Sequence, residues 1–500
     1  MKPLKENFFK TPYTILSLLM LSLPCFSQQE TRALTLDQVL ERAQTHSLIA
    51  LRANNQYLAG YWQFRSYKAS LLPHIGLDLT PVDYNRSFIQ RYDPENDVDV
   101  FREQQTYYAN SSVYISQNLG FSGGTLSLST GLSHLENLNS PEFSAYNASP
   151  VQLTYHQPLL GFNEFKWQKR LQPLQYQLAR QQFIENSQQI HLEAIARYFE
   201  VLLAHTQKEI ALHNRSTSDT LYQIGKKRFA LAAIPKEELL NLELNKFKAD
   251  IALAQAEKHI QRAQFNLNSF LSYDENTAIQ PELPKGAFPQ QIAVDQAIAR
   301  AIQHNPEMIG LQEKNLQASR NLDKARKESR LNANLMASFG LNNSATEMNQ
   351  AYQDLANRQQ VRVGMQIPLA DWGQRKGQRL MAEKQKEVAT LEIQQTRLDF
   401  EQKVALKVID FNLQHKLVNS ALQAADIAEQ AYELTKKRFV LGKTDVLQLN
   451  SASQTRQDAQ EGFIRAVYTL WQLYYEVQQL TLYDFRKEQP LSIDFKQMVR

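Results

Sequence analysis

The chain has 500 residues, a formal net charge of +4 and no block of like charge, so it lacks the electrostatic pattern of a nucleic-acid-binding protein. Its 16 glycines and 17 prolines are few for this length, whereas Gln, Leu, Ala, Lys and Glu are abundant, which is typical of long helices. The single cysteine is Cys25, which excludes disulfides, cysteine metal sites and thiol catalysis in the rest of the chain.

Residues 1–27 have the features of a signal peptide. Lysines near the N-terminus precede an apolar segment at 13–23, which is shorter than the roughly 20 residues that a membrane-spanning helix needs. Cleavage after Ser27 would remove Cys25. The alternative is that Cys25 carries a lipid, although Pro24 directly before it fits that processing poorly.

The remaining sequence contains two copies of one pattern. The segment Tyr222–Leu231 returns as Tyr432–Leu441 with Lys-Lys-Arg-Phe at the same places. Copies that keep one internal order indicate a duplicated structural unit. We assign 28–289 to the first repeat, 290–485 to the second and 486–500 to a C-terminal tail.

Each repeat opens with a short amphipathic helix. Apolar residues recur at helical spacing from Leu36 in the first copy and from Val294 in the second. His46 and His304 occupy matching places near the ends of these helices. We interpret both as structural residues, because the histidines of the chain show no metal-ligand spacing.

The next part of each repeat alternates apolar and polar residues, as half-buried strands do. The candidate strands are 74–90, 107–119, 125–136 and 150–158 in the first repeat, and 333–343 and 359–368 in the second. Lengths of about ten residues suit a tilted crossing of a bilayer, although an ordinary soluble sheet alternates in the same way.

The segments between these strands separate into two kinds. Segments 90–105 and 136–150 are polar and acidic, and we expect them to be external loops. Segment 120–124 is rich in glycine but lacks the spacing of a nucleotide-binding loop, so a turn is expected there.

Long helices follow the strands in both repeats. The expected helical arms are 163–232 and 236–270 in the first repeat, and 377–439 and 445–482 in the second. The longest would extend on the order of 100 Å at 1.5 Å per residue. Such a helix needs a partner helix along its length, and a generic coiled-coil spacer would satisfy this requirement equally well.

Four stretches carry a resemblance to a known family. They are Gln157-Pro158-Leu159, Ile367–Gly373, Arg438–Leu447 and Tyr474–Phe485. In this order, and with the duplication, the chain from Leu34 to Phe485 resembles the TolC-like outer-membrane efflux proteins. The resemblance implies an α+β membrane protein of long antiparallel coiled-coil helices and β-hairpins. It also implies a homotrimer whose outer-membrane β-barrel continues into a periplasmic α-helical tunnel, with the C-terminal tail in the periplasm.

The implied function is that of an exit duct of a tripartite efflux pump, which conducts substrates passively to the exterior. Its partners would be a periplasmic adaptor protein, an inner-membrane RND or ABC pump and the lipid of the outer membrane. No cofactor is expected, and no catalytic motif is present in the sequence. The alternatives are a type I protein-secretion duct of the same family and a periplasmic coiled-coil adaptor or scaffold protein.

The sequence departs from the family pattern in its strands. The first repeat has four strand candidates, where the family has two in each repeat. The additional pair is either a further hairpin of the barrel or an external flap with longer, bent strands.

The resemblance also assigns roles to the two corners that join the helical arms. These corners would dock the adaptor, through Ala232, Ala233 and Ile234 at the first corner and Gly442, Lys443, Thr444 and Leu447 at the second. Acidic rings narrow the tunnel of the family near this end, and Asp445 matches such a position. Three copies of one carboxylate around an axis would favour cations. The alternative to a docking role is an ordinary helix–turn–helix corner, with Gly442 near the helix end and Asp445 as an N-cap, and the two roles do not exclude each other.

Overall fold

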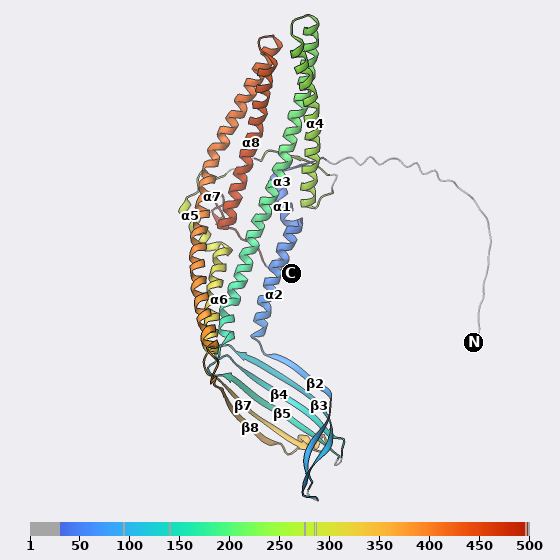
Figure 1. Cartoon of the computed structure of the whole chain (residues 1–500), viewed down its shortest axis with the longest axis vertical. Helices are drawn as coiled ribbons and strands as arrows, with labels where there is room; N and C mark the ends of the chain where they lie inside the picture. Colours follow the sequence, from blue (N-terminus) through green and yellow to red (C-terminus); the bar gives the residue numbers. More distant parts are fainter. Residues whose placement is uncertain are drawn as a thin grey trace, which may run out of the picture.

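A computed structural model describes residues 31–93, 96–139, 142–274, 277–284, 286, 288–495 and 498. The predicted signal peptide and Cys25 therefore lie outside the described residues. The molecule is elongated, with a sheet at one end and long helices that extend away from it (Figure 1).

The sheet has six strands in the order β2-β3-β4-β5-β7-β8, and every neighbouring pair is antiparallel. The strands are β2 (His74–Asp93), β3 (Val98–Leu119), β4 (Gly124–Asn137), β5 (Phe143–Pro158), β7 (Asn332–Ala345) and β8 (Ala356–Gln366). The first repeat thus contributes four strands and the second contributes two. The glycine-rich segment forms the turn between β3 and β4, where Gly123 has a φ of 82° and its N–H donates to the Leu119 carbonyl at 2.8 Å.

The expectation of external loops at 90–105 and 136–150 was wrong. Residues up to Asp93 continue β2, and β3 already begins at Val98, so this segment is mostly a hairpin. In the same way, β5 begins at Phe143. Polar residues on both faces obscured the alternation that marks a strand, whereas backbone pairing along the hairpin needs no apolar face.

The two faces of the sheet differ in polarity. One continuous row across the strands contains Ile75, Ile115, Leu128, Leu153, Phe339 and Gln359. The adjacent row on the opposite face contains His74, Ser116, Ser127, Thr154, Ser338 and Gln360. Phe339 is 53% exposed, whereas Ser338 beside it is 7% exposed. The apolar face is therefore the open one.

The two repeats build helices of equal lengths. Helices α3 (Glu164–Ala230) and α7 (Gln374–Val440) have 67 residues each, and α4 (Lys236–Leu271) and α8 (Val446–Thr481) have 36 each. Helix α4 packs along α3, and α8 packs along α7. The main core lies where these helices meet and includes Tyr198, Phe411 and Tyr474, all fully buried.

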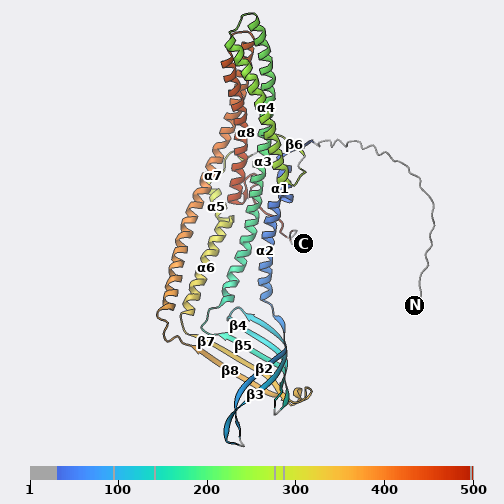
Figure 2. The same ribbon diagram turned by 45° about the vertical axis from the view of Figure 1, so that its right-hand side comes forward.

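Shorter helices lie beside the long ones, and we call the whole row of helices the helical wall. The amphipathic helices are α1 (Leu36–His46) and α5 (Val294–His304), which end at the two matched histidines as predicted. Two further helices, α2 (Leu48–Ser70) and α6 (Pro306–Glu328), escaped the sequence analysis. Helices α2, α3, α6 and α7 lie side by side in that order above the sheet (Figure 2).

Small elements surround the helices at mid-length. Strands β1 (Thr31–Leu34) and β6 (Ala278–Pro281) pair in parallel. The Tyr198 hydroxyl lies 2.6 Å from the Glu282 carbonyl oxygen and accepts a hydrogen bond from the Glu282 N–H at 3.0 Å. We call β1, β6 and Tyr198 the waist, because they tie the start and the end of the first repeat to α3.

The segment that follows α8 turns back onto α2 and α3. Short strands β9 (Tyr483–Asp484) and β10 (Gln489–Pro490) pair after α8. Elsewhere in the chain, a 3-10 helix, η1 (Gln350–Tyr352), lies between β7 and β8. The Phe495 ring packs 4.8 Å from Tyr57 of α2 and 6.0 Å from Phe183 of α3. None of the helices in the described ranges is both long and apolar enough to cross a membrane.

Candidate functional site

The first helix corner is a tight turn with a left-handed residue. Helix α3 ends at Ala230, and the Ala233 N–H then donates to the Arg228 carbonyl at 2.8 Å. This bond requires a left-handed backbone at Ala232, whose φ is 55°. Glycine is the residue that usually occupies this place after a helix, because a Cβ is strained there.

The second corner repeats this geometry with the favoured residue. Gly442 has a φ of 74°, and the Lys443 N–H donates to the Arg438 carbonyl at 2.9 Å. Ala232 and Gly442 therefore hold equivalent positions. The predicted docking residues Ala232, Ala233, Gly442, Lys443 and Leu447 are exposed, whereas Ile234 and Thr444 are half-buried.

Asp445 is the N-cap of α8, as the structural alternative predicted. Its carboxylate accepts the Gln448 N–H at 2.8 Å, and the side chain is exposed. Thr444 donates to the Gln448 side chain. The first corner has no such cap, because Pro235 stands directly before Lys236 and offers no side-chain acceptor. Only the second corner of the described chain thus presents a carboxylate in the cap position.

Arg228 joins the two corners, and sequence analysis did not single it out. Its guanidinium donates to the Val440 carbonyl at 2.9 Å and lies 5.8 Å from the centre of the Phe439 ring. The positive group therefore meets the Val440 carbonyl at the C-terminal end of α7, where the helix dipole favours a cation. A small apolar cluster that includes Leu221, Leu242 and Phe439 packs beneath it.

A second arginine joins the repeats further from the corners. The Arg456 side chain is only 5% exposed, and its guanidinium lies 3.9 Å from the centre of the Tyr432 ring. It donates to the Asn214 side chain on α3 at 3.0 Å and lies 3.8 Å from the Glu429 carboxylate. The cation thus connects α8 to both α3 and α7.

Exposed leucines surround the corners, and only Leu447 of them was among the predicted docking residues. Leu231, Leu441 and Leu447 are 80%, 69% and 77% exposed. Leu231 and Leu441 hold equivalent places in the two repeats, so the repeated segment already contained this signal. A pair of apolar residues at the end of the molecule, beside turns of fixed geometry, is suited to contact with another protein.

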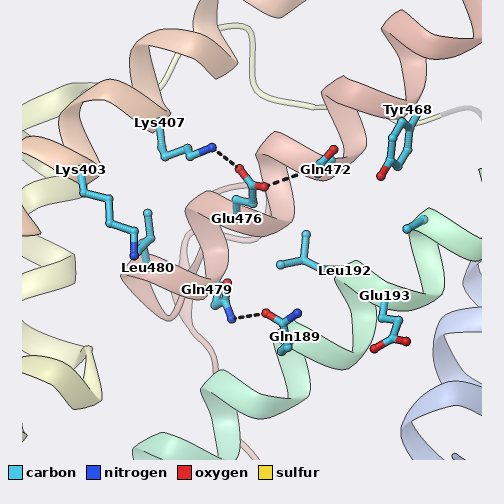
Figure 3. Close-up of a pocket in the computed structure, with 11 residues that line it drawn as sticks. Gln189, Leu192, Glu193, Lys403, Lys407, Tyr468, Gln472, Glu476, Gln479 and Leu480 are labelled. Carbon is cyan, nitrogen blue, oxygen red and sulfur yellow. Dashed lines mark hydrogen bonds and ion pairs between the residues drawn. The ribbon is translucent and has the colours of Figure 1, made fainter. Parts of the chain in front are cut away.

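A polar cleft lies between α3, α7 and α8, nearer the waist (Figure 3). Its volume is about 460 Å³. Lys407 and Glu476 form an ion pair at 2.7 Å, and Gln479 donates to Gln189 across the cleft at 2.9 Å. Lys403 extends toward Leu480 in the same view. Most of the side chains that line the cleft are Gln, Glu and Lys.

Among the described residues, no three or more His, Cys, Asp or Glu side chains gather where they could hold a metal ion. The carboxylates of Asp445, Glu429 and Glu476 instead cap a helix or pair with basic side chains.

Part of the chain matches a family model. Residues 297–481 match the model described as outer membrane efflux protein. The matched segment runs from α5 through α8 and so includes the second corner and β7 and β8. No match to the chain was found among curated proteins.

Solved structures share the fold over most of the chain. The outer membrane channel CmeC of Campylobacter jejuni is 13% identical with a TM-score of 0.66, covering 99% of this chain and 96% of that one. The outer membrane protein VceC of Vibrio cholerae is 14% identical with a TM-score of 0.64, covering 89% and 95%. The MtrE outer membrane channel of Neisseria gonorrhoeae, in its open state, is 13% identical with a TM-score of 0.58, covering 89% and 88%.

Proposed function

We propose that the chain, whose residues 297–481 match the outer membrane efflux protein model, is the exit duct of an efflux pump. It would conduct substrates passively from the periplasm to the exterior. The observation that carries this proposal is the sheet, whose apolar face is open to its surroundings while its opposite face is lined with Ser, Thr and Gln. A sheet between lipid and a water-filled lumen has this division.

The duct would be a homotrimer embedded in the outer membrane. One chain leaves the backbone groups of β2 and β8 unpaired at the two ends of the sheet. Hydrocarbon does not tolerate such edges, because each unpaired group costs several kcal/mol there. Neighbouring copies would pair these edges, so that the sheets of three chains form one barrel and the helices form a periplasmic tunnel below it.

The helix corners would meet a periplasmic adaptor protein that links the duct to an inner-membrane pump. The support for this step is the exposed side chains of Leu231, Leu441 and Leu447 at the two corners. The corners lie at the end of the molecule farthest from the sheet (Figure 1). An adaptor would cover these side chains, which otherwise remain in water.

The location and the channel activity can be tested together. The protein, expressed with its N-terminal segment, should fractionate with the outer membrane and shift its mobility on a gel when boiled, as barrels do. Purified protein should conduct ions in a planar bilayer. Recovery as a soluble periplasmic protein without conductance would refute the proposal and favour a coiled-coil scaffold.

Asp445 would contribute charge to the narrow end of the tunnel, and its capping role can be separated from that charge. Asp445→Asn keeps an N-cap acceptor but removes the carboxylate, because asparagine caps helices about as well as aspartate. Both Asp445→Asn and Asp445→Ala should then reduce cation preference in planar bilayers. A change with alanine alone would assign Asp445 to the cap, and unchanged selectivity in both variants would exclude it from the gate.

A further inference from the structure

We propose that β8 of one copy pairs with β2 of the next in a single register that places Arg362 opposite Asp78. Three copies of the six-stranded sheet then close a barrel of eighteen strands. This inference rests on the proposed trimer, but it fixes the seam between the copies and the size of the barrel.

The strand directions allow this seam. All pairs within the sheet are antiparallel, and the number of strands is even, so β2 and β8 run in opposite directions. The β8 edge of one copy can therefore meet the β2 edge of the next as one more antiparallel pair. The helices allow the same arrangement, because α2 leads into β2 and β8 leads into α7. At the seam, α7 of one copy would therefore lie beside α2 of the next.

The polarity of the faces restricts the register. On β2 the apolar face carries Ile75, Leu77 and Leu79, and on β8 it carries Val361, Val363 and Met365. All six side chains are exposed. A slip of one residue would turn one of these sets to the opposite face. The register can therefore change only in steps of two residues.

Charge selects one register among those that remain. When the ends nearest the helices are level, Gln366 lies opposite His74, and Met365 lies opposite Ile75. The same alignment places Arg362 opposite Asp78. Both side chains are exposed, and neither has an ion-pair or hydrogen-bond partner among the described residues. A slip of two residues would place Arg362 opposite Gly76 or Thr80, which carry no charge.

The geometry of a closed barrel agrees with this register. Within one copy, the row of directly opposite residues that begins at Ile75 on β2 ends at Gln359 on β8. At the proposed seam, Ile75 of the next copy lies opposite Met365, which is six residues beyond Gln359 on the same strand. Each chain of six strands thus contributes a stagger of six residues, and the barrel has a shear equal to its number of strands. That ratio gives a strand tilt of about 36° in the eight-stranded barrel with shear 8, within the usual range for closed barrels.

The sheet then matches the helical wall in width. Strands about 4.8 Å apart and tilted by about 36° each occupy roughly 6 Å of circumference, so six strands span about 36 Å. Helices α2, α3, α6 and α7 at an average spacing of about 9 Å also span about 36 Å. Six strands therefore continue four helices without a step in the wall, which gives the additional hairpin a structural purpose.

Disulfide cross-linking between introduced cysteines tests the register directly. The double variant Asp78→Cys, Arg362→Cys should form disulfide-linked chains in the outer membrane, because a directly opposite pair brings its Cα atoms within disulfide range. The control pairs are Thr80→Cys with Arg362→Cys and Asp78→Cys with Gln360→Cys. They test slips of two residues in either direction, and each should cross-link far less.

Every outcome of this experiment is informative. Trimers that link only through a control pair would overturn the register, and trimers that link through none would overturn the seam. A protein that never forms trimers in the outer membrane would instead refute the proposed function.

Exchanging the two charges tests the register independently of the cysteine pairs. Asp78→Arg and Arg362→Asp alone should lower the temperature at which the trimer dissociates on a gel, and the double exchange should restore it.

Discussion

Ala232 and Gly442 show how one residue type sets the local stability of otherwise equivalent corners. Both have a left-handed backbone, and both precede an N–H that bonds back to an arginine carbonyl in the helix. The left-handed conformation costs a residue with a Cβ roughly 1–2 kcal/mol, and glycine avoids this cost. The first corner therefore carries strain that the second lacks.

Exchanging these residues should exchange the stabilities of the corners. Ala232→Gly should strengthen the first corner by about 1 kcal/mol, and Gly442→Ala should weaken the second by a similar amount. Hydrogen exchange at the amides of Ala233 and Lys443 measures this, with a change of roughly fivefold in opposite directions. Faster exchange in both variants would show that something other than the backbone strain governs the corners.

His191 makes the folded chain sensitive to acid. Burial lowers the pKa of His191 from 6.5 to about 4, and its ring packs edge-on against Tyr475 at 5.5 Å. The unfolded chain thus binds a proton at a pH where the folded chain does not. The folded state is fully favoured above pH 6.5 and loses stability as the pH falls from 6.5 toward 4.

Replacing the ring should remove this loss. His191→Phe should have a melting temperature that varies less between pH 6.5 and 4 than that of the parent protein. The difference in unfolding free energy at pH 4 is at most about 3 kcal/mol, since the side chain retains some solvent contact. His46→Gln at an exposed helix end serves as the control. Equal pH dependence in the parent and His191→Phe would assign the acid sensitivity to other groups.

At this scale, local chemistry was predictable and tertiary contact was not. The cap at Asp445 follows from its place just before a helix, so the sequence indicated it. The contact of Arg228 with Val440 joins residues far apart in the chain, and its repeat partner Arg438 makes no such bond among the described residues. No pattern distinguishes these two arginines before the chain is folded.

At the scale of elements, periodicity predicted the long helices and the strands but not α2. Helix α2 buries only Ala50, Ala53 and Tyr57, and its other apolar residues are spread around its circumference. It lacks an amphipathic stripe because it lies at one end of the row of helices, where α3 is its main packing partner. The extended hairpin of β2 and β3 was missed for a related reason, since its outer part has no apolar face to alternate with a polar one.

The contact between the helix pairs should depend on Arg228 and not on Arg438. Arg228→Ala removes the bond to the end of α7, so the two corners should separate more often. Spin labels on the exposed positions Leu231→Cys and Leu441→Cys would report a longer and broader distance by pulsed electron resonance. The matched control Arg438→Ala should leave that distance unchanged. An equal effect of both variants would assign the change to lost positive charge in general.

At the scale of the whole molecule, the six-stranded sheet has one apolar face and one polar face. If the open face contacts lipid, a charge there should prevent insertion, whereas a charge on the lumen face should be tolerated. Adjacent residues of β4 provide the comparison, because Leu128 lies in the apolar row and Ser127 lies in the polar row. The sequence indicated this division, but the register that aligns it across six strands emerged only with the fold.

Leu128→Lys should reduce the folded fraction in the outer membrane, because a lysine facing the bilayer interior costs about 2–4 kcal/mol. Ser127→Lys should insert normally. The amount of protein that shifts its mobility on boiling measures both. Equal losses in the two variants would contradict the assignment of the faces.

The waist has a mechanical consequence for the helices beyond it. Tyr198 fixes α3 at mid-length, and the stretch from there to Ala230 is about 48 Å at 1.5 Å per residue. In mechanical terms the waist is a pivot point, and the part of α3 beyond Tyr198 is an arm that ends at the first corner. A rotation of about 5° at the pivot point would displace the corner by roughly 4 Å over that length. A tilt of α3 by a few degrees at Tyr198 would therefore move the first corner by more than the length of a hydrogen bond.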